Sequence, residues 1–162
     1  MSTQTGTVTL REITPEDFTT IFEFERDQLA NQMAAFTAKD PNDRAAFDAH
    51  KMKILNNPEC IALAVEADGV LVGTVGKFDL GDQPNITYWI GREFWGRGYA
   101  TSALKELLHM CPERPIYGRA AFDNIASQKV LEKCGFVKIE TDMFYANARQ
   151  AEIEEVIFKL DR

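Results

Sequence analysis

The fold of this chain can be read outward from residues 88–108, whose sequence is Tyr88-Trp-Ile-Gly-Arg-Glu-Phe-Trp-Gly-Arg-Gly-Tyr-Ala-Thr-Ser-Ala-Leu-Lys-Glu-Leu-Leu108. Aromatic and β-branched residues over positions 86–90 predict a strand. Three glycines then interrupt the pattern, which is typical of a loop. From residues 97–98 onward, apolar side chains recur at helical spacing, at Ala100, Leu104, Leu107 and Leu108. The stretch therefore predicts a strand, a glycine-bearing loop and an amphipathic helix.

The junction between this loop and this helix is a candidate site for an anion. The first turn of a helix has backbone N–H groups without intrahelical partners, and the helix dipole adds partial positive charge there. Gly96 and Gly98 lack a Cβ atom, so a phosphate can approach those N–H groups closely. The spacing matches neither a P-loop nor the Gly-x-Gly-x-x-Gly dinucleotide motif. The alternative is a turn that needs glycine only for its backbone angles.

The sequence Trp95-Gly-Arg-Gly-Tyr-Ala100 resembles the acetyl-CoA pyrophosphate loop of the GNAT superfamily of N-acetyltransferases. The usual pattern there is Gln/Arg-x-x-Gly-x-Gly/Ala; Gly98 and Ala100 match its last two fixed positions, and Trp95 departs from its first. A tryptophan followed by Gly-Arg-Gly-Tyr-Ala-Thr is similar to the Rim-type branch, which includes enzymes acting on ribosomal-protein N-termini. Downstream, Asn124-Ile-Ala-Ser127 and Leu131-Glu-Lys-Cys-Gly-Phe136 resemble a second segment of that branch, in the expected order and spacing.

This resemblance covers residues 88–136 and implies an α/β (α+β) fold with a mixed, mostly antiparallel sheet. About four helices would wrap the sheet, and the two central strands would split apart. The implied cofactor is acetyl-CoA, whose pantetheine arm would lie in the split, with a backbone N–H near Ile90 as the donor to the thioester oxygen. The resemblance assigns to the cofactor Trp89, Ile90, Gly91, Trp95, Gly96, Arg97, Gly98, Tyr99, Ala100, Thr101, Asn124, Ser127 and Lys133.

Length and composition fit one globular domain over residues 1–162. The chain is 45% hydrophobic and 27% charged, and it is long enough to bury a substantial core. No apolar run is long enough to span a bilayer, and residues 1–9 lack the parts of a signal peptide. The net charge of −7 disfavours sequence-independent binding to nucleic acid. We therefore expect a cytoplasmic protein, monomeric or homodimeric, without a nucleic-acid or membrane partner.

Cysteines and histidines show no metal-ligand spacing. Cys60, Cys111 and Cys134 are an odd number in a chain without a secretion signal, which fits reduced thiols. His50 and His109 fall at positions expected on helix surfaces or ends. The sequence therefore predicts no metal site.

Caps, turns and periodicity predict the remaining elements. Residues 14–17, Thr-Pro-Glu-Asp, predict the start of a helix that runs to about residue 30, followed by a linker over 31–39. A second helix is expected over 44–55, and Asp68-Gly69 predicts a hairpin turn. Strands are expected over 7–13, 60–67, 70–80, 116–122, 136–144 and 152–160, and a helix over 124–133.

The acceptor site is implied by the resemblance alone. In this superfamily the segment joining the first two helices commonly lines that site, which makes Met33 and Phe36 candidates for substrate contact. The alternative is that both side chains pack on the core. Asn85, where many relatives carry a glutamate, is the third substrate-binding candidate.

Acetyl transfer needs a neutral amine, a donor to the carbonyl oxygen and a proton for the departing thiolate. The sequence identifies no side-chain base, and Leu131 stands where many family members have a tyrosine acid. Ser127 can relay or donate a proton, or its hydroxyl only binds CoA or a backbone carbonyl. Asn124 either positions CoA or caps the helix. Tyr88 and Tyr145 are further acid candidates, unless they are packed aromatics.

The absence of a side-chain base affects which acceptor amine is expected. An α-amino group has a pKa near ~7.8 and a lysine near ~10.4, so at neutral pH roughly a tenth of the first and fewer than about one in a thousand of the second are uncharged. An enzyme without a strong base therefore favours an amine of low pKa, such as a peptide N-terminus or an amino sugar.

Three functions remain open at this point. The first is an N-acetyltransferase that moves acetyl from acetyl-CoA to a primary amine, a peptide N-terminus or a small amine, by direct attack in a ternary complex. The second is a non-catalytic CoA-binding sensor or degenerate relative, which the missing tyrosine and glutamate favour. The third is an interaction domain whose glycines are only structural.

Overall fold

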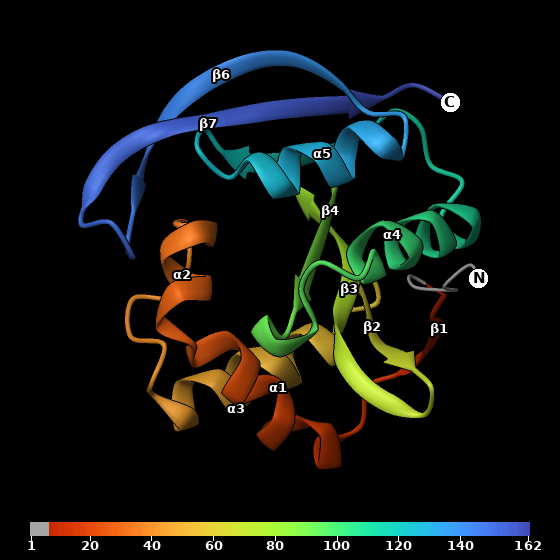
Figure 1. Ribbon diagram of the computed structural model, residues 1–162, viewed down its shortest axis with the longest axis vertical. Coiled ribbons are helices and arrows are strands. Elements are labelled where there is room, and N and C mark those ends of the chain that lie inside the picture. The colour runs from red at the N-terminus through yellow and green to blue at the C-terminus, as the bar shows by residue number, and fades with distance from the viewer. Residues whose placement is uncertain (1–6) are drawn as a thin grey trace.

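The computed structural model describes residues 7–162 as a seven-stranded sheet with helices on both faces (Figure 1). The strand order is β1-β2-β3-β4-β5-β7-β6, and within these residues β4 and β5 form the one parallel pair. The strands are β1 (Thr9–Glu12), β2 (Ile61–Ala67), β3 (Val70–Leu80), β4 (Gln83–Ile90), β5 (Ile116–Ala121), β6 (Val137–Ala146) and β7 (Ala151–Leu160). The helices are α1 (Phe18–Arg26), α2 (Gln28–Ala34), α3 (Arg44–Leu55), α4 (Tyr99–Met110) and α5 (Ile125–Lys133). The expected mixed, mostly antiparallel sheet is confirmed.

The two central strands are paired only near their starts. Asn85 of β4 lies opposite Tyr117 of β5, and no other register pair joins these strands in the described chain. β4 nevertheless continues to Ile90 and β5 to Ala121. The strands therefore separate toward their carboxyl ends, which is the split that the resemblance implies.

The two faces of the sheet are identified by neighbouring residues of β4. The indole Nε1 of Trp89 donates to the Phe24 carbonyl of α1 at 3.0 Å, whereas the Tyr88 hydroxyl bonds to Ser127 of α5. Successive side chains of a strand point to opposite faces, so α1 and α5 lie on opposite sides. We call these the α1 face, which also carries α2 and α3, and the α5 face, which also carries α4.

The main core fills the α5 face. Leu104 and Leu107 of α4 and Leu131 of α5 are fully buried there against the sheet. Gly118 of β5 makes this packing possible, because a Cβ atom at that position would come within 2.5 Å of the Leu131 side chain. In Figure 1 the β6–β7 hairpin arches over the end of the molecule that carries α5.

The first helical region differs from the sequence expectation. Instead of one helix to about residue 30 and a linker over 31–39, the chain breaks at Asp27, whose ψ is 127°, and α2 follows at once. The Asp27 carboxylate accepts the Ala30 N–H at 2.9 Å, so it caps α2 rather than continuing α1. The helical pattern therefore continues for one more short helix, and the linker begins only after Ala34.

Smaller differences lie at strand and helix ends. β4 begins at Gln83 because its pairing with β3 extends to Leu80, and α4 begins at Tyr99 with Gly98 as its N-cap. β1 is shorter than expected, and β6 and β7 extend closer to their turn. α3 and β3 have the expected bounds. In residues 7–162 no helix combines the length and the apolar character needed to cross a bilayer.

Candidate functional site

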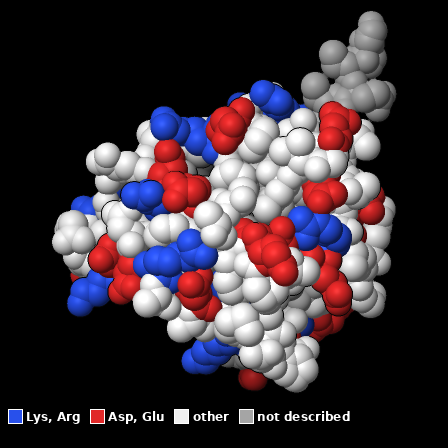
Figure 2. All heavy atoms as spheres, turned by 90° about the horizontal axis from the view of Figure 1, so that it is seen from below, with Lys and Arg blue, Asp and Glu red and all other residues white. Residues whose placement is uncertain are grey.

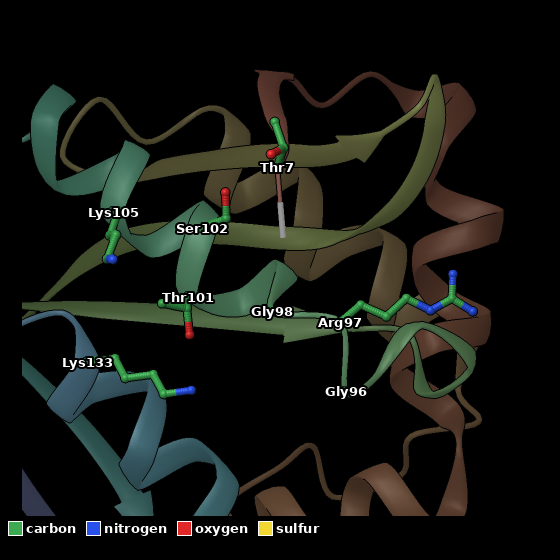
Figure 3. A pocket seen from close by; sticks show the side chains of 8 residues that line it. All are labelled: Thr7, Gly96, Arg97, Gly98, Thr101, Ser102, Lys105 and Lys133. Carbon is green, nitrogen blue, oxygen red and sulfur yellow. The ribbon is translucent and has the colours of Figure 1, made fainter. Parts of the chain in front are cut away.

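A pocket of about 420 Å³ opens at the N-terminus of α4 (Figure 3). Gly98, with a φ of 78°, caps this helix, and Gly96 has a φ of 79°. Glycine adopts such left-handed angles without the Cβ strain of other residues. Gly98 has no side chain with which to cap α4, and no side-chain cap from residues 7–162 is found on its first turn, so the N–H groups of that turn are available to the pocket. The residues that line the pocket are Thr7, Gly96, Arg97, Gly98, Thr101, Ser102, Lys105 and Lys133.

Two lysines from different helices supply positive charge to this pocket. Lys105 comes from α4 and Lys133 from the end of α5, and Figure 3 shows Lys133 reaching toward the first turn of α4. The Arg97 side chain instead extends away, with its guanidinium carbon 5.8 Å from the centroid of the Phe94 ring. The Arg97 backbone therefore borders the pocket, while its guanidinium group points away from it. Elsewhere, on the face drawn in Figure 2, basic and acidic side chains intermingle.

Other predicted cofactor residues surround this pocket. Thr101 lines it, while Tyr99 and Ala100 form the first turn of α4 and Tyr99 packs against the core. Trp95 is 38% exposed, and its indole donates to the Ile90 carbonyl at 2.8 Å. That bond ties the loop to the end of β4.

The end of β4 turns a backbone N–H toward the split. The Gly91 N–H donates to the Val72 carbonyl at 2.9 Å, which makes these two residues a hydrogen-bonded pair across β3 and β4. Bonded and non-bonded pairs alternate along an antiparallel ladder, so Ile90, opposite Gly73, belongs to a non-bonded pair. Its amide therefore points away from β3, on the side where β5 diverges.

Tyr88 and Ser127 meet on the α5 face beside the split. Their hydroxyl oxygens lie 2.5 Å apart, and Tyr88 Oη also donates to the Ser127 carbonyl at 3.1 Å. Burial raises the pKa of Tyr88 to about 12, so the phenol remains protonated at neutral pH. Asn124 caps α5 by accepting the Ser127 N–H at 3.2 Å, and Leu131 lies in the core.

The predicted acceptor residues lie toward the α1 face. Asn85 is only 1% exposed and shares that face with Trp89; its Nδ2 donates to the Gln83 carbonyl, and its Oδ1 has no partner in residues 7–162. Phe36 packs on the small buried residues Ala35, Ala121 and Ala146. Met33 is half-buried on α2.

A hydrogen-bonded clasp joins the end of α2 to the β6–β7 turn. Gln32 Nε2 donates to the Ala148 carbonyl and Arg149 Nε to the Gln32 carbonyl, each at 2.7 Å, and Asn147 Nδ2 donates to the Thr37 carbonyl at 2.7 Å. Arg149 also pairs with Asp123 at 2.9 Å. The clasp holds Phe36 and its segment against the end of β5.

The sequence interpretation missed one charged pair on the same face. Arg119 of β5 bonds Glu155 of β7 at 3.1 Å, and Glu155 is 9% exposed. Burial raises the pKa of Glu155, Asp142 adds to the rise, and Arg119 opposes it. One signal was available: Ile153, Glu155 and Ile157 alternate on one face of a strand, so a glutamate occupies an apolar position.

Comparison with solved structures finds the same fold in several acetyltransferases. RimJ from Mycobacterium smegmatis, in complex with a CoA disulfide, has a TM-score of 0.82 at 19% identity over 95% of this chain and 81% of that chain. The spermidine N-acetyltransferase from Vibrio cholerae, in complex with CoA and spermine, has a TM-score of 0.77 at 19% identity over 94% and 95%. The phosphinothricin acetyltransferase from Sinorhizobium meliloti, in complex with acetyl-CoA, has a TM-score of 0.81 at 16% identity over 96% and 88%.

A search of curated proteins found no significant match. The acetyltransferase (GNAT) domain model, in contrast, matches residues 7–137, which hold the α4 pocket, the split and the Tyr88–Ser127 pair. The chain therefore belongs to the GNAT acetyltransferase domain family.

Proposed function

We propose that this acetyl-CoA-dependent N-acetyltransferase acetylates a primary amine, a peptide N-terminus or a small amine, by direct attack in a ternary complex. The observation that carries the proposal is the pocket at the start of α4. The first-turn N–H groups of α4, the two left-handed glycines and the ammonium groups of Lys105 and Lys133 suit a pyrophosphate. When bound, acetyl-CoA supplies an activated thioester.

Several residues of the chain would hold the cofactor. The first turn of α4, from Gly98 to Thr101, and Lys133 bind the phosphates, while Trp95 fixes the loop through its bond to the Ile90 carbonyl. Trp89 to Gly91 border the split and orient the pantetheine arm. Asn124 acts by capping α5 beside the split rather than by a free side chain.

Two donors of this chain, the Ile90 N–H and the Ser127 hydroxyl, carry the proposed chemistry at the thioester. The Ile90 N–H, turned away from β3, would be the donor to the thioester oxygen of bound acetyl-CoA. The Tyr88–Ser127 pair holds a proton at Ser127 Oγ for the departing sulfur. Proximity would supply much of the remaining acceleration.

The acceptor would approach from the α1 face. The phosphate pocket lies at the start of α4 on the opposite face, so an attacking amine reaches the split from the side of α1 and α2. Met33 and Phe36 would then contact it. Asn85 is fully buried at the level where β4 still pairs with β5, so its side chain would border the floor of the split rather than touch the amine.

Two observations bear on the chemical class of the acceptor amine. Solved relatives include a spermidine, a phosphinothricin and a RimJ acetyltransferase, which act on different amines. The Trp95-Gly-Arg-Gly-Tyr-Ala100 motif supports the Rim-type branch and hence a peptide N-terminus.

The test is thiol release from acetyl-CoA by the purified protein with a panel of amines at several pH values. Peptides with free N-termini, peptides with blocked N-termini and a lysine, aminoglycosides and polyamines cover the acceptor classes. Turnover with one class establishes the acceptor. CoA binding by calorimetry without turnover on the panel would instead support the binding-module alternative, which the buried Leu131 in place of a tyrosine favours.

A further inference from the structure

Two carboxylates are buried in the described chain, those of Asp17 and Glu155. Both carboxylate oxygens of Asp17 accept hydrogen bonds from residues 7–162, but only one oxygen of Glu155 does. Asp17 receives two guanidinium bonds from Arg11 and the Thr14 N–H. Glu155 receives one bond, from Arg119 Nη1 to Oε1, and no hydrogen bond from residues 7–162 reaches Oε2. Oε2 is not one of the fully buried side-chain atoms without a partner in residues 7–162, so this oxygen keeps contact with solvent and can accept a proton.

Glu155 lies at the acceptor side of the split. In the β5–β7 register it stands opposite Ala121, the last residue of β5, and residues directly opposite share a face. Ala121 packs with Ala35 and Phe36, the segment that the clasp holds down on the α1 face. Glu155 therefore shares the α1 face with the segment that carries Phe36 and lies at the level where β4 has diverged.

The groups that face Glu155 come from three elements. Arg119 of β5 carries the opposing positive charge, and Asp142 of β6, its partner in the β6–β7 register, adds a negative one. The segment after α2 contributes Ala35 and Phe36 there, neither of which titrates. Burial and Asp142 outweigh Arg119, so the pKa of Glu155 lies above that of an ordinary glutamate. A proton acceptor works best when its pKa approaches the working pH.

We propose that Glu155, through Oε2 and directly or across one water, accepts the proton of the attacking ammonium, with Arg119 as the positioning residue. The inference rests on the proposed function. The nitrogen lone pair freed by this transfer forms the N–C bond to the acetyl carbon, and the C–S bond breaks with its electron pair going to sulfur. The departing sulfur takes the proton held at Ser127 Oγ, the second nitrogen proton replaces the proton of the Tyr88–Ser127 pair, and Glu155 later loses its proton to solvent. One ammonium and one thioester thus yield one amide, one thiol and one proton.

This assignment relaxes the preference for amines of low pKa. The sequence alone offered no base, which favoured acceptors that are already neutral at pH 7. With Glu155 as proton acceptor, an amine of higher pKa, such as a lysine or a polyamine, also becomes a chemically competent acceptor.

The main experiment compares Glu155→Gln with Glu154→Gln. Glu154 is the exposed neighbour on β7 that points to the opposite face, so it is a matched change of charge. With the amine found by thiol release, we expect Glu155→Gln to lower kcat by about 10²- to 10⁴-fold. Its CoA affinity by calorimetry should match the wild type, and its remaining rate should rise with pH as the amine itself deprotonates. Glu154→Gln should behave as the wild type.

A second measurement is independent of turnover. The ¹³C NMR titration of glutamate carboxyls in the wild type, with the Glu155 signal assigned by its loss in Glu155→Gln or Glu155→Asp, should give a pKa above the ordinary glutamate range. The same pKa should appear as the acidic limb of the kcat/KM profile. Asp142→Asn should shift both to lower pH, because it removes a like charge.

The results distinguish failure of the proposed function from failure of the role assigned to Glu155. A wild type that binds CoA but releases no thiol with any amine overturns the proposed function. An active wild type whose acidic limb and kcat persist in Glu155→Gln overturns only the role of Glu155. If Glu155→Gln does not fold because Arg119 loses its partner, an NMR pKa at or below the ordinary glutamate range overturns that role as well.

Discussion

The hydroxyl oxygens of Tyr88 and Ser127 lie 2.5 Å apart and link β4 to α5 beside the split. Their residues are 39 positions apart in the chain, and β4 and β5 no longer pair at this level. Burial raises the pKa of the phenol to about 12, which keeps its proton in place at neutral pH. The proposed acid role requires these two hydroxyls to act together as a short proton chain toward the split.

We expect Tyr88→Phe to lower kcat by about 10²-fold or more, because it removes one link of this proton chain while keeping the ring. Ser127→Ala should cause a loss of similar size, and the double variant should be little worse than the single ones, since residues that act as a unit are not additive. CoA affinity, measured by calorimetry, serves as the control and should stay within about twofold, a difference that amounts to only a few tenths of a kcal/mol. Strictly additive losses would contradict a shared chain.

Gly98→Glu should abolish measurable CoA binding. A side chain at the N-cap of α4 fills the approach to the first-turn N–H groups, and its negative charge repels a phosphate. Calorimetric titration with CoA measures the loss. Gly81→Ala is the matched control for backbone strain: Gly81 has a φ of 63° in the β3–β4 turn, so that variant should lose stability but bind CoA normally. CoA binding that survives Gly98→Glu would mean that the cradle lies elsewhere.

Lys133→Gln should weaken CoA binding by about tenfold at low ionic strength, because it removes one charge from the pocket at the start of α4. Salt screens this interaction, so the difference from the wild type should shrink between roughly 0.05 and 0.5 M salt. Lys129→Gln, an exposed residue of the same helix that does not line the pocket, carries the same change of charge and should leave affinity nearly unchanged. Equal effects of both variants would point to net charge alone.

Asp17 should make folding stability depend on pH. The Arg11 guanidinium holds the pKa of this carboxyl below its usual value, so the stabilisation is complete above an unfolded pKa near ~3.9 and is lost as pH falls through the lowered folded pKa. Asp17→Asn should reduce the free energy of unfolding by about 1.5–3 kcal/mol at pH 7, and this difference should shrink toward pH 2.

Urea unfolding at several pH values measures this dependence. Asp48→Asn is the control, because Asp48 forms an exposed ion pair with Arg44 and should cost less than about 0.5 kcal/mol. A constant difference between the wild type and Asp17→Asn across the pH range would contradict the assignment.

Much of the fold could be predicted from local signals. The bounds of α3 and β3 follow from a cap, a stop and a hairpin turn, and the resemblance located Gly98, Thr101 and Lys133, which the structure gathers into one pocket. The break at Asp27 was missed, because an aspartate inside an amphipathic pattern either continues a helix or caps the next one. Only the packing of α2 shows which of these occurs.

By itself, the sequence determined the order of most elements, the glycine-bearing turn before α4 and the resemblance to the family, because caps, turns, periodicity and motifs act over a few neighbouring residues. Only the tertiary structure decided which distant side chains meet. β7 inserts between β5 and β6, and this brings Glu155 to Arg119 across 36 positions of the chain. Strand order and register depend on which faces become buried together, a property of the whole sheet that no single stretch of sequence contains.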